Sequence, residues 1–356
     1  MSGSDDPRGR GAPRRRLAPA RRLASVGRLA SVGRLEGVAV RLVAVAALGL
    51  VGAGHAAAQV ALVDDLPPRF EWAGWLAADF RTELKTRTDG GDSFETWGMG
   101  VAGDFGGPIN ESILLGLRSS YRYTAYDFRL DNPGNVPPGY GGSELPRDPW
   151  GAIHTLDLAP NMTVLIGDRF SVVTAVPIRW SAENGSQKDA LIGGISAIVR
   201  WQIVDSVRLG AGIGVTSQIE GDAETFPVLS AHWDMTDSLA FQTEGSWIQG
   251  GRGMLLWGPN RAIRLSLSAG YERNRFRLDD NGTSADRNGI GEVTTVPVEV
   301  GLRVRLFEGA HLDASAGLGV AGRLRVETDG GRKLYEEDYD PSPRFSFALR
   351  LPFGMP

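Results

Sequence analysis

Residues 296–306 read Val-Pro-Val-Glu-Val-Gly-Leu-Arg-Val-Arg-Leu, and every second residue is aliphatic. The residues between the aliphatic ones are small or charged, and they include Glu299, Arg303 and Arg305. Successive side chains of a β-strand point to opposite faces. The stretch therefore predicts a strand with one apolar face and one polar face.

The same alternation recurs along the chain after residue 69, at 70–84, 113–124, 170–181, 207–219 and 345–353. The connections between these segments are alternately short and long. Short connections are predicted near 106–110, 167–169, 203–206, 235–238, 258–261 and 307–310. Long ones are predicted near 87–92, 131–149, 183–189, 220–224, 279–290 and 327–342, with one further turn near Gly250-Gly251. This pattern predicts an all-β fold, a transmembrane antiparallel up-and-down β-barrel of about fourteen strands, or twelve if 252–257 is not a strand.

Aromatic residues on the apolar faces support a membrane-spanning barrel. Near the short connections these are Phe105, Trp201, Trp233, Trp257 and Phe353, and near the long ones Trp97, Trp150, Trp180, Trp247 and Tyr271. Ten residues at ~3.3 Å each, tilted by ~45°, span roughly 23 Å, which is close to the apolar band of an outer-membrane barrel. A soluble β-sandwich is the alternative for the same alternation, but it gives no reason for two aromatic girdles.

The first 58 residues differ from the rest of the chain. They hold ten Arg, no Lys and three acids, followed by an apolar run from Leu42 to Ala53 and by Ala56-Ala-Ala58. This order predicts a basic region and cleavable signal peptide at 1–58, with the barrel at 59–356. The remaining residues hold 28 bases and 39 acids, a balance of −11, so they lack the basic surface that a nucleic-acid partner needs. The chain has no Cys, which excludes disulfides and thiolate sites.

Three segments carry a resemblance to known proteins: Phe345-Ser-Phe-Ala-Leu-Arg-Leu-Pro-Phe353, Trp257-Gly-Pro259 and Gly270-Tyr-Glu-Arg-Asn-Arg-Phe-Arg-Leu278. They resemble bacterial outer-membrane β-barrel proteins of an uncharacterised family, and the resemblance covers about residues 60–356. It implies location in the bacterial outer membrane, with the last strand read by the barrel assembly machinery. Gly354-Met-Pro356 after Phe353 departs from the aromatic ending of that class. The resemblance transfers no catalytic residues.

Motifs for cofactors or metals are weak. Gly98-Met-Gly100-Val-Ala-Gly103 and Gly317-Leu-Gly319-Val-Ala-Gly322 match a dinucleotide fingerprint, but both lie within predicted strands, where the fingerprint needs a helix to follow. No His pair has metal-ligand spacing, so neither a cofactor nor a metal is predicted. His154 on the apolar face, with Ser119 on the preceding strand, leaves open a lipid-modifying enzyme as the alternative function.

The inward faces carry charges of both signs. The inward candidates are Asp79, Arg81, Glu83, Arg118, Arg122, Asp157, Arg179, Arg208, Glu244, Arg264, Glu272, Glu299, Arg303, Arg305, Asp313 and Arg323. Such a lumen favours a non-enzymatic pore or structural barrel for small hydrophilic solutes, with selectivity set by Arg118, Arg122, Arg179, Arg208 and Arg303. A narrower barrel whose charges pair across the lumen and seal it is the alternative. The loop 131–149 is the best candidate to fold inward.

Long connections suggest two further possibilities. The chain could be a surface adhesion or anchoring barrel, an alternative that rests on the loops alone. The acidic loops 279–292 and 335–340 could bridge lipopolysaccharide phosphates through divalent cations, which would make outer-membrane lipid a partner. Neither loop has calcium-loop spacing, and a solvated loop is the simpler interpretation. The sequence gives no indication of the oligomeric state.

Overall fold

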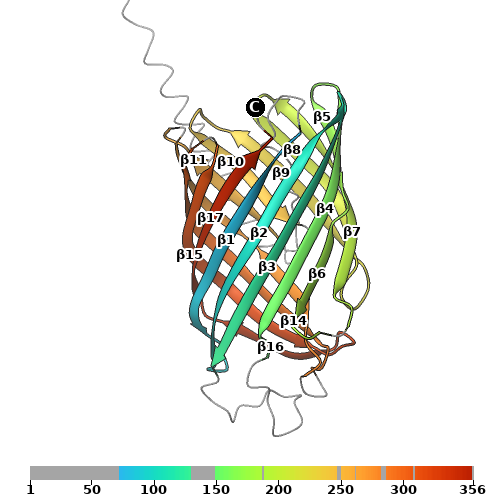
Figure 1. The fold of residues 1–356 in the computed structure, drawn as a ribbon, viewed down its shortest axis with the longest axis vertical. Helices are drawn as coiled ribbons and strands as arrows, with labels where there is room; N and C mark the ends of the chain where they lie inside the picture. Colours follow the sequence, from blue (N-terminus) through green and yellow to red (C-terminus); the bar gives the residue numbers. More distant parts are fainter. Residues whose placement is uncertain are drawn as a thin grey trace, which may run out of the picture. The chain divides into compact units, whose positions relative to one another are not determined.

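The computed structural model describes residues 72–129, 149–186, 188–246, 250–260, 262–281, 286–307 and 309–354, without the side chains of 244–246. The predicted signal peptide at 1–58, Trp247 and residues 131–148 of the predicted inward loop lie outside these ranges, and Glu244 is described only by its backbone. The strands form one continuous sheet, antiparallel except for a single bridge between β13 and β6 (Figure 1). No helix in the described ranges is long and apolar enough to cross a membrane.

The strands are β1 (Ala73–Arg87), β2 (Ser93–Asn110), β3 (Ile113–Arg129), β4 (Ala152–Ile166), β5 (Phe170–Ala175), β6 (Ile178–Glu183), β7 (Leu191–Val204), β8 (Val207–Thr216), β9 (Glu224–Asp234), β10 (Leu239–Ser246), β11 (Gly250–Trp257), β12 (Ile263–Gly270), β13 (Glu272–Arg277), β14 (Ile290–Arg305), β15 (His311–Glu327), β16 (Lys333–Tyr339) and β17 (Ser342–Phe353). Three pairs are single strands interrupted once. β5 and β6 both pair with β4 and β7, β12 and β13 both pair with β14, and β16 and β17 both pair with β15. The seventeen segments therefore make fourteen strands around the barrel. This confirms the predicted count, with 252–257 as a true strand.

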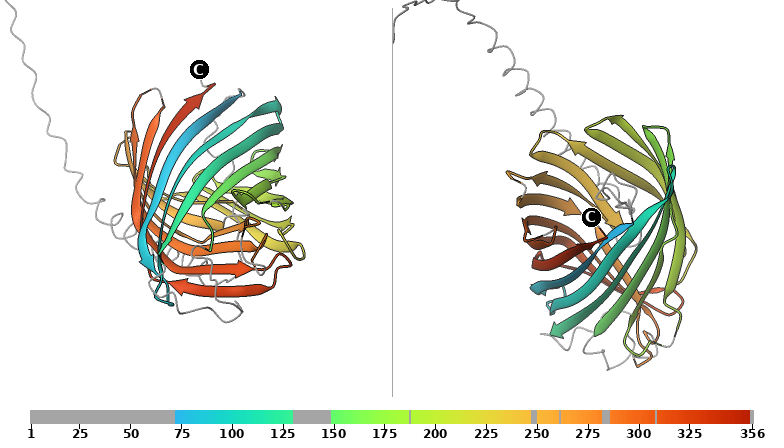
Figure 2. Two further views of the ribbon diagram at one scale, coloured as in Figure 1. Left: turned by 60° about the horizontal axis from the view of Figure 1, so that its bottom comes forward. Right: turned by 45° about the horizontal axis from the view of Figure 1, so that its top comes forward.

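The sheet closes on itself, because β1 pairs with β17 from Gly74↔Phe353 to Glu83↔Arg344 (Figure 2). Turns of two to five residues join the strands at the end where β1 begins and β17 finishes, hereafter the short-turn end. Three predicted connections are misplaced. Gly250 and Gly251 belong to β11 and do not form a turn. Residues 106–110 belong to β2, and the turn is Glu111-Ser112. Residues 333–339 form β16. The predicted loop 327–342 is therefore reduced to the connection 328–332, and a two-residue break separates β16 from β17.

The outer surface of the barrel is apolar. Leu76, Phe80 and Leu84 of β1 are 59%, 42% and 45% exposed, which is the reverse of a soluble fold. Aromatic residues bound this belt at both ends. Of the predicted girdle residues, the exposed ones are Phe105, Trp201, Trp257 and Phe353 near the short turns and Trp97 and Trp180 near the long loops. A closed sheet satisfies its backbone hydrogen bonds without water, as a bilayer requires. The chain is an outer-membrane β-barrel.

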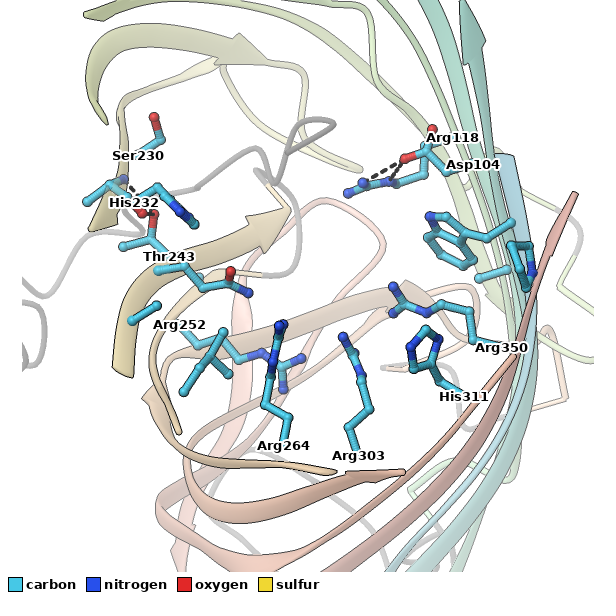
Figure 3. Close-up of a pocket in the computed structure, with 18 of the residues that line it drawn as sticks. Asp104, Arg118, Ser230, His232, Thr243, Arg252, Arg264, Arg303, His311 and Arg350 are labelled. Carbon is cyan, nitrogen blue, oxygen red and sulfur yellow. Dashed lines mark hydrogen bonds and ion pairs between the residues drawn. The ribbon is translucent and has the colours of Figure 1, made fainter. Parts of the chain in front are cut away.

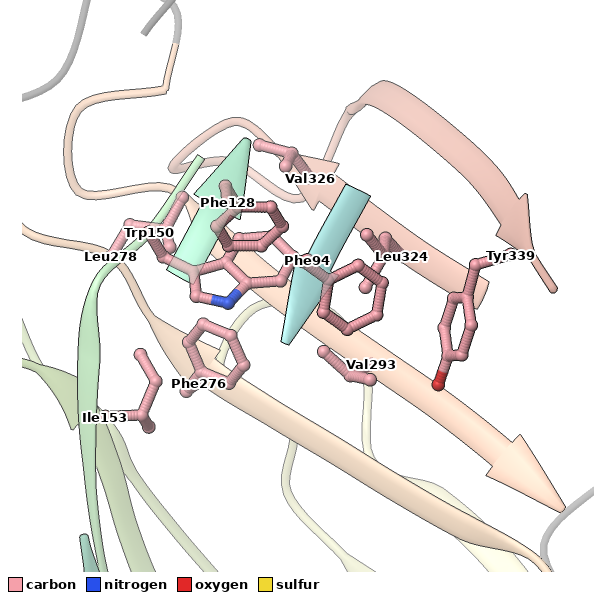
Figure 4. Close-up of a cluster of buried hydrophobic side chains, with 10 residues drawn as sticks. All are labelled: Phe94, Phe128, Trp150, Ile153, Phe276, Leu278, Val293, Leu324, Val326 and Tyr339. Carbon is pink, nitrogen blue, oxygen red and sulfur yellow. The ribbon is translucent and has the colours of Figure 1, made fainter. Parts of the chain in front are cut away.

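A core of close-packed apolar side chains lies inside the barrel at the long-loop end (Figure 4). This plug consists of Phe94, Phe128, Trp150, Ile153, Phe276, Leu278, Val293, Leu324, Val326 and Tyr339, all at most 9% exposed. Its ring contacts cross the lumen, because Phe276 of β13 lies 5.2 Å from Trp150 and 6.4 Å from Tyr126 of β3 between ring centroids. The prediction that Trp150 belongs to the outer girdle is therefore wrong. Trp150 precedes β4, so strand alternation does not fix its direction, and it packs into the plug.

The barrel wall has unequal height. β8 to β11 have eight to eleven residues each, whereas β14 and β15 have sixteen and seventeen. The chain continues from β12 into β13 beyond the end of the short strand β11. There β13 forms a single parallel bridge with β6, Arg277↔Ala182. The Arg277 guanidinium is buried and donates hydrogen bonds to the carbonyls of Asp189 and Asn288 and to the carboxylate of Glu220. One side chain thus joins three long loops and narrows this end of the barrel around the plug.

A bulge in β15 reverses the predicted direction of Arg323. The register with β14 shifts between Thr294 and Val296, and Ala321 adopts a φ of 51° at that point. The extra residue turns the following side chains to the opposite face. Leu324 enters the plug, while Arg323 points outward and binds Asp338 of β16 at 2.8 Å. Arg323 is therefore not a lumen residue, contrary to the sequence prediction.

Gly322 leaves room for the ring of Tyr339, since a Cβ at this position would overlap that ring. We expect Gly322→Ala to lower the free energy of unfolding by about 1–3 kcal/mol through overpacking. Denaturant unfolding of the barrel in detergent, followed by tryptophan fluorescence, measures the change. Gly330→Ala is the control, because a Cβ at Gly330 meets no atom within 4 Å. Equal unfolding midpoints for the two variants would contradict the assignment.

Candidate functional site in the barrel lumen

A cavity of about 1180 Å³ occupies the short-turn half of the lumen (Figure 3). Its lining includes Asp237, Gly258 and Gly309, which belong to three short turns, so the cavity extends to that end of the barrel. A further cavity of about 360 Å³ lies deeper and is bordered by Phe94, Tyr126 and Val293 of the plug and its surroundings. The lumen is therefore open space at the short-turn end and packed side chains at the other.

The larger cavity is positively charged. Its lining holds ten Arg against five acidic residues, whereas residues 59–356 as a whole carry a balance of −11. The arginines are Arg81, Arg118, Arg122, Arg200, Arg208, Arg252, Arg264, Arg303, Arg305 and Arg350, and the acids are Asp104, Asp157, Asp234, Asp237 and Glu272. An excess of one sign inside low-dielectric walls raises the local concentration of the opposite ion. The lining of this cavity thus holds five more arginines than acids.

Four of the five arginines predicted to set selectivity line this cavity: Arg118, Arg122, Arg208 and Arg303. Arg118 donates two hydrogen bonds to Asp104 Oδ2, at 3.1 and 2.8 Å. Arg122 of β3 lies 3.3 Å from Asp79 of β1.

Arg179 borders neither cavity. Its side chain is 1% exposed, donates to Asn274 Oδ1 of β13 at 3.2 Å and lies 3.7 Å from Asp157 of β4. It connects β6 to β13 near their parallel bridge, so the structure places it inside the barrel in packed contact rather than in open space.

Other cavity residues escaped the sequence analysis, among them Arg200, Arg252, Arg350 and His311. Arg200 lies on β7, where Ile192 and Ile198 also face inward and are buried. Apolar residues thus lie on both faces of β7, so alternation does not show which face points into the lumen. For Arg350 the signal was present, since it alternates with the outward Leu349 and Leu351 in the last strand.

A network of charges separates the open cavity from the plug. Arg344 of β17 is 9% exposed and reaches Glu83 of β1 at 2.9 Å and Glu272 of β13 at 2.8 Å. Glu299 lies 4.0 Å from Arg344 and 3.8 Å from Arg252. Charges in such a place are stable only when paired or wetted. This layer forms the floor of the cavity.

The pair considered for lipid hydrolysis does not assemble. Ser119 pairs with Leu158 in the sheet, whereas His154 pairs with Tyr123, so the two side chains are four residues apart along the strands, ~13 Å. His154 Nδ1 instead shares a hydrogen bond of 2.7 Å with the Tyr121 hydroxyl. A nucleophile and its base need hydrogen-bond distance, which this pair lacks.

The acidic segments differ from the solvated loops that were predicted. In 335–340, Glu336 and Asp338 lie on β16 and face Arg325 and Arg323 of β15, so this segment is a strand with paired charges and not a loop. In 279–292, Asp286 is buried and β14 begins at Ile290, while residues 282–285 lie outside the described ranges. The described residues contain no cluster of three or more His, Asp or Glu that could hold a metal ion.

The loop between β15 and β16 is linked to the loop after β6. Lys188 Nζ donates a hydrogen bond of 2.8 Å to Asp329 Oδ2. This bond, with the charge of the ammonium, holds the pKa of the Asp329 carboxyl below its usual range.

Both glycine-rich matches lie inside strands, in β2 and β15, and no helix follows either of them.

Comparison with known proteins yields only distant similarities. No protein-family model matches the chain, and no curated protein matches it. An outer membrane channel from Pseudomonas putida F1 is 10% identical over 82% of this chain and 100% of its own, with a TM-score of 0.43. The P. putida toluene transporter TodX is 10% identical over 82% of this chain and 92% of its own (TM-score 0.39), and LpxR from Salmonella typhimurium is 8% identical over 77% and 99% (TM-score 0.30). Similarities of this degree transfer neither a substrate nor an activity.

Arg344 is the residue on which the charged floor depends. We expect Arg344→Met to lower the free energy of unfolding by about 1–3 kcal/mol, because Glu83 and Glu272 would remain partly buried without their cation. Adding Glu83→Gln and Glu272→Gln should recover most of the loss. Denaturant midpoints of the two variants and of the outward control Arg323→Met measure this. A triple variant no more stable than Arg344→Met would contradict the charge argument.

Proposed function

We propose that the barrel is a non-enzymatic outer-membrane channel for small hydrophilic solutes, closed at its long-loop end by the apolar plug. The observation that carries the proposal is the contrast between the two halves of one lumen. At ~30 Å³ per water molecule, the 1180 Å³ cavity has room for about 40 waters beside its ten arginines. A barrel with a purely structural role has no need for such a space, since packed side chains would stabilise it better.

The plug has the composition of a hydrophobic gate. Apolar constrictions stop water and ions by dewetting, without a covalent or charged barrier. The plug residue Phe276 is on β13, the segment that leaves β12 and is held to the loops by Arg277. Displacement of this segment would separate Phe276 from Trp150 and Tyr126, the two rings it contacts across the lumen. The proposed gating element is therefore β13.

Selectivity within the proposed channel is assigned to the arginines that border open space. Arg118, Arg122, Arg208 and Arg303 keep this role from the sequence analysis, because each lines the cavity. Arg179 is reassigned to holding β6 and β13 together. The proposal predicts preference for anions over cations, in keeping with the excess of arginine over acids in the lining.

Single-channel recording in planar bilayers tests the proposed function. We expect the natural barrel to open rarely, and Phe94→Ala/Phe276→Ala to show discrete, frequent conductance steps, because it removes two rings from the plug. Phe347→Ala is the control, since this side chain is 54% exposed on the outer face. Heat-modifiable migration on a gel confirms folding before recording. Silence from a folded double variant would reject the channel and leave a structural barrel.

A further inference from the structure

We infer that one wall of the cavity, formed by β12, β14, β15 and β17, is a binding site for a small solute that carries several anionic oxygen groups, such as phosphates or carboxylates. This inference names the solute class of the proposed channel and rests on that function in so far as the solute passes through the barrel. It is carried by strand register, by the composition of the wall and by the direction of its side chains.

The register places basic side chains side by side in two rows. In the row nearer the short turns, Arg305 of β14 pairs with His311 of β15, which pairs in turn with Arg350 of β17. In the next row, Arg264 of β12 pairs directly with Arg303 of β14. All five residues line the cavity, and Figure 3 shows Arg264, Arg303, His311 and Arg350 extending into the same space.

Like charges opposite each other on neighbouring strands destabilise a sheet. Within the two rows the compensating acid is Asp313, which binds Arg303 at 2.6 Å and completes the second row on β15. Among the described residues no ion pair involves Arg264 or Arg305, so an anionic occupant would offset two charges that the rest of the described chain does not compensate. Arginine suits this task, because its planar fork binds phosphate or carboxylate through two hydrogen bonds.

The basic residues on the strands that flank this wall are paired with acids. Arg118 of β3 is held by Asp104 of β2 at 2.8 Å (Figure 3). His232 of β9 lies 3.3 Å from Asp234. Farther around the ring, β7 and β8 add Arg200 and Arg208 to the lining. The wall of β12 to β17 is distinguished by Arg264 directly opposite Arg303.

The spacing of the rows sets the size of the solute. Residues two apart on a strand, such as Arg303 and Arg305, are ~6.6 Å apart, and neighbouring strands are ~4.8 Å apart. Two anionic groups joined by a short link could occupy both rows at once, so a polyvalent solute should bind more tightly than a single phosphate. Arg350 also lies 4.4 Å from the ring centre of Trp75, which places an indole beside the site.

Isothermal titration of the folded barrel in detergent at low salt tests the site, with inorganic phosphate and tripolyphosphate as probes. We expect tripolyphosphate to bind more tightly than phosphate. Arg264→Gln/Arg305→Gln should weaken its binding at least tenfold, and the matched outward variant Arg323→Gln should leave it unchanged. Arg264→Lys, which keeps the charge but loses the fork, should lie between them. Quenching of Trp75 fluorescence, identified by its loss in Trp75→Phe, should follow the same order.

Two results would overturn the site: no binding of tripolyphosphate by the natural barrel, or equal binding by Arg264→Gln/Arg305→Gln and Arg323→Gln. The titration needs no transport, so it separates the two proposals. Binding together with silence from the folded plug variant would keep the anion site and reject the channel. Conductance without binding would keep the channel and reject the site.

Discussion

Everything in this molecule depends on the pairing of its first strand with its last. A lipid bilayer offers no hydrogen-bond partner to backbone N–H and C=O groups, so a sheet that spans it must have no edge. The ladder from Gly74↔Phe353 to Glu83↔Arg344 removes the edge by joining β1 to β17. Once the ring is closed, each strand has one face toward lipid and one toward the lumen. The outward face must be apolar, while the inward face is left to whatever the interior requires.

The inward side chains differ between the two ends of the barrel. Near the short turns, arginines and acids line open space and are stabilised by water and by each other, as in Arg118 with Asp104. Near the long loops, Phe94, Phe276 and their neighbours pack together and exclude water. Arg344 lies between these regions, and its charge is compensated by Glu83 and Glu272. The layers follow from where water can and cannot reach.

Much of the fold could be predicted from the sequence, because lipid imposes a period of two on every outward face. The strand count, the closed ring and four lumen arginines follow from that period alone. Prediction failed where something other than local alternation decides direction. Arg323 is turned outward by the bulge at Ala321, and no single residue type marks such a bulge. Trp150 lies outside any strand, and residues 333–339 are so charged that only their partners on β15 reveal a strand.

Long-range contacts were equally out of reach. The inward direction of Arg179 was predicted correctly, but its burial depends on β13 meeting β6, strands that are separated in the sheet by β7 to β11. The ring contacts of Phe276 in the plug depend on the same approach of β13 to β6. Local pattern therefore predicts which residues enter the lumen, and only the closed structure shows whether they find water, a partner or a packed core.

The unequal wall also has a consequence for the membrane around it. Eight residues of β10 or β11, at ~3.3 Å each and tilted by ~45°, cover about 19 Å along the bilayer normal, whereas the apolar band of such barrels is about 25 Å tall. Hydrophobic mismatch of this size thins the adjacent bilayer. Lipids next to β10 and β11 must shorten or tilt their chains while those beside β14 and β15 need not. The bilayer around the barrel is thus thinner beside β10 and β11 than beside β14 and β15. The thin side has a fixed position relative to the wall of β12, β14, β15 and β17 inside the barrel.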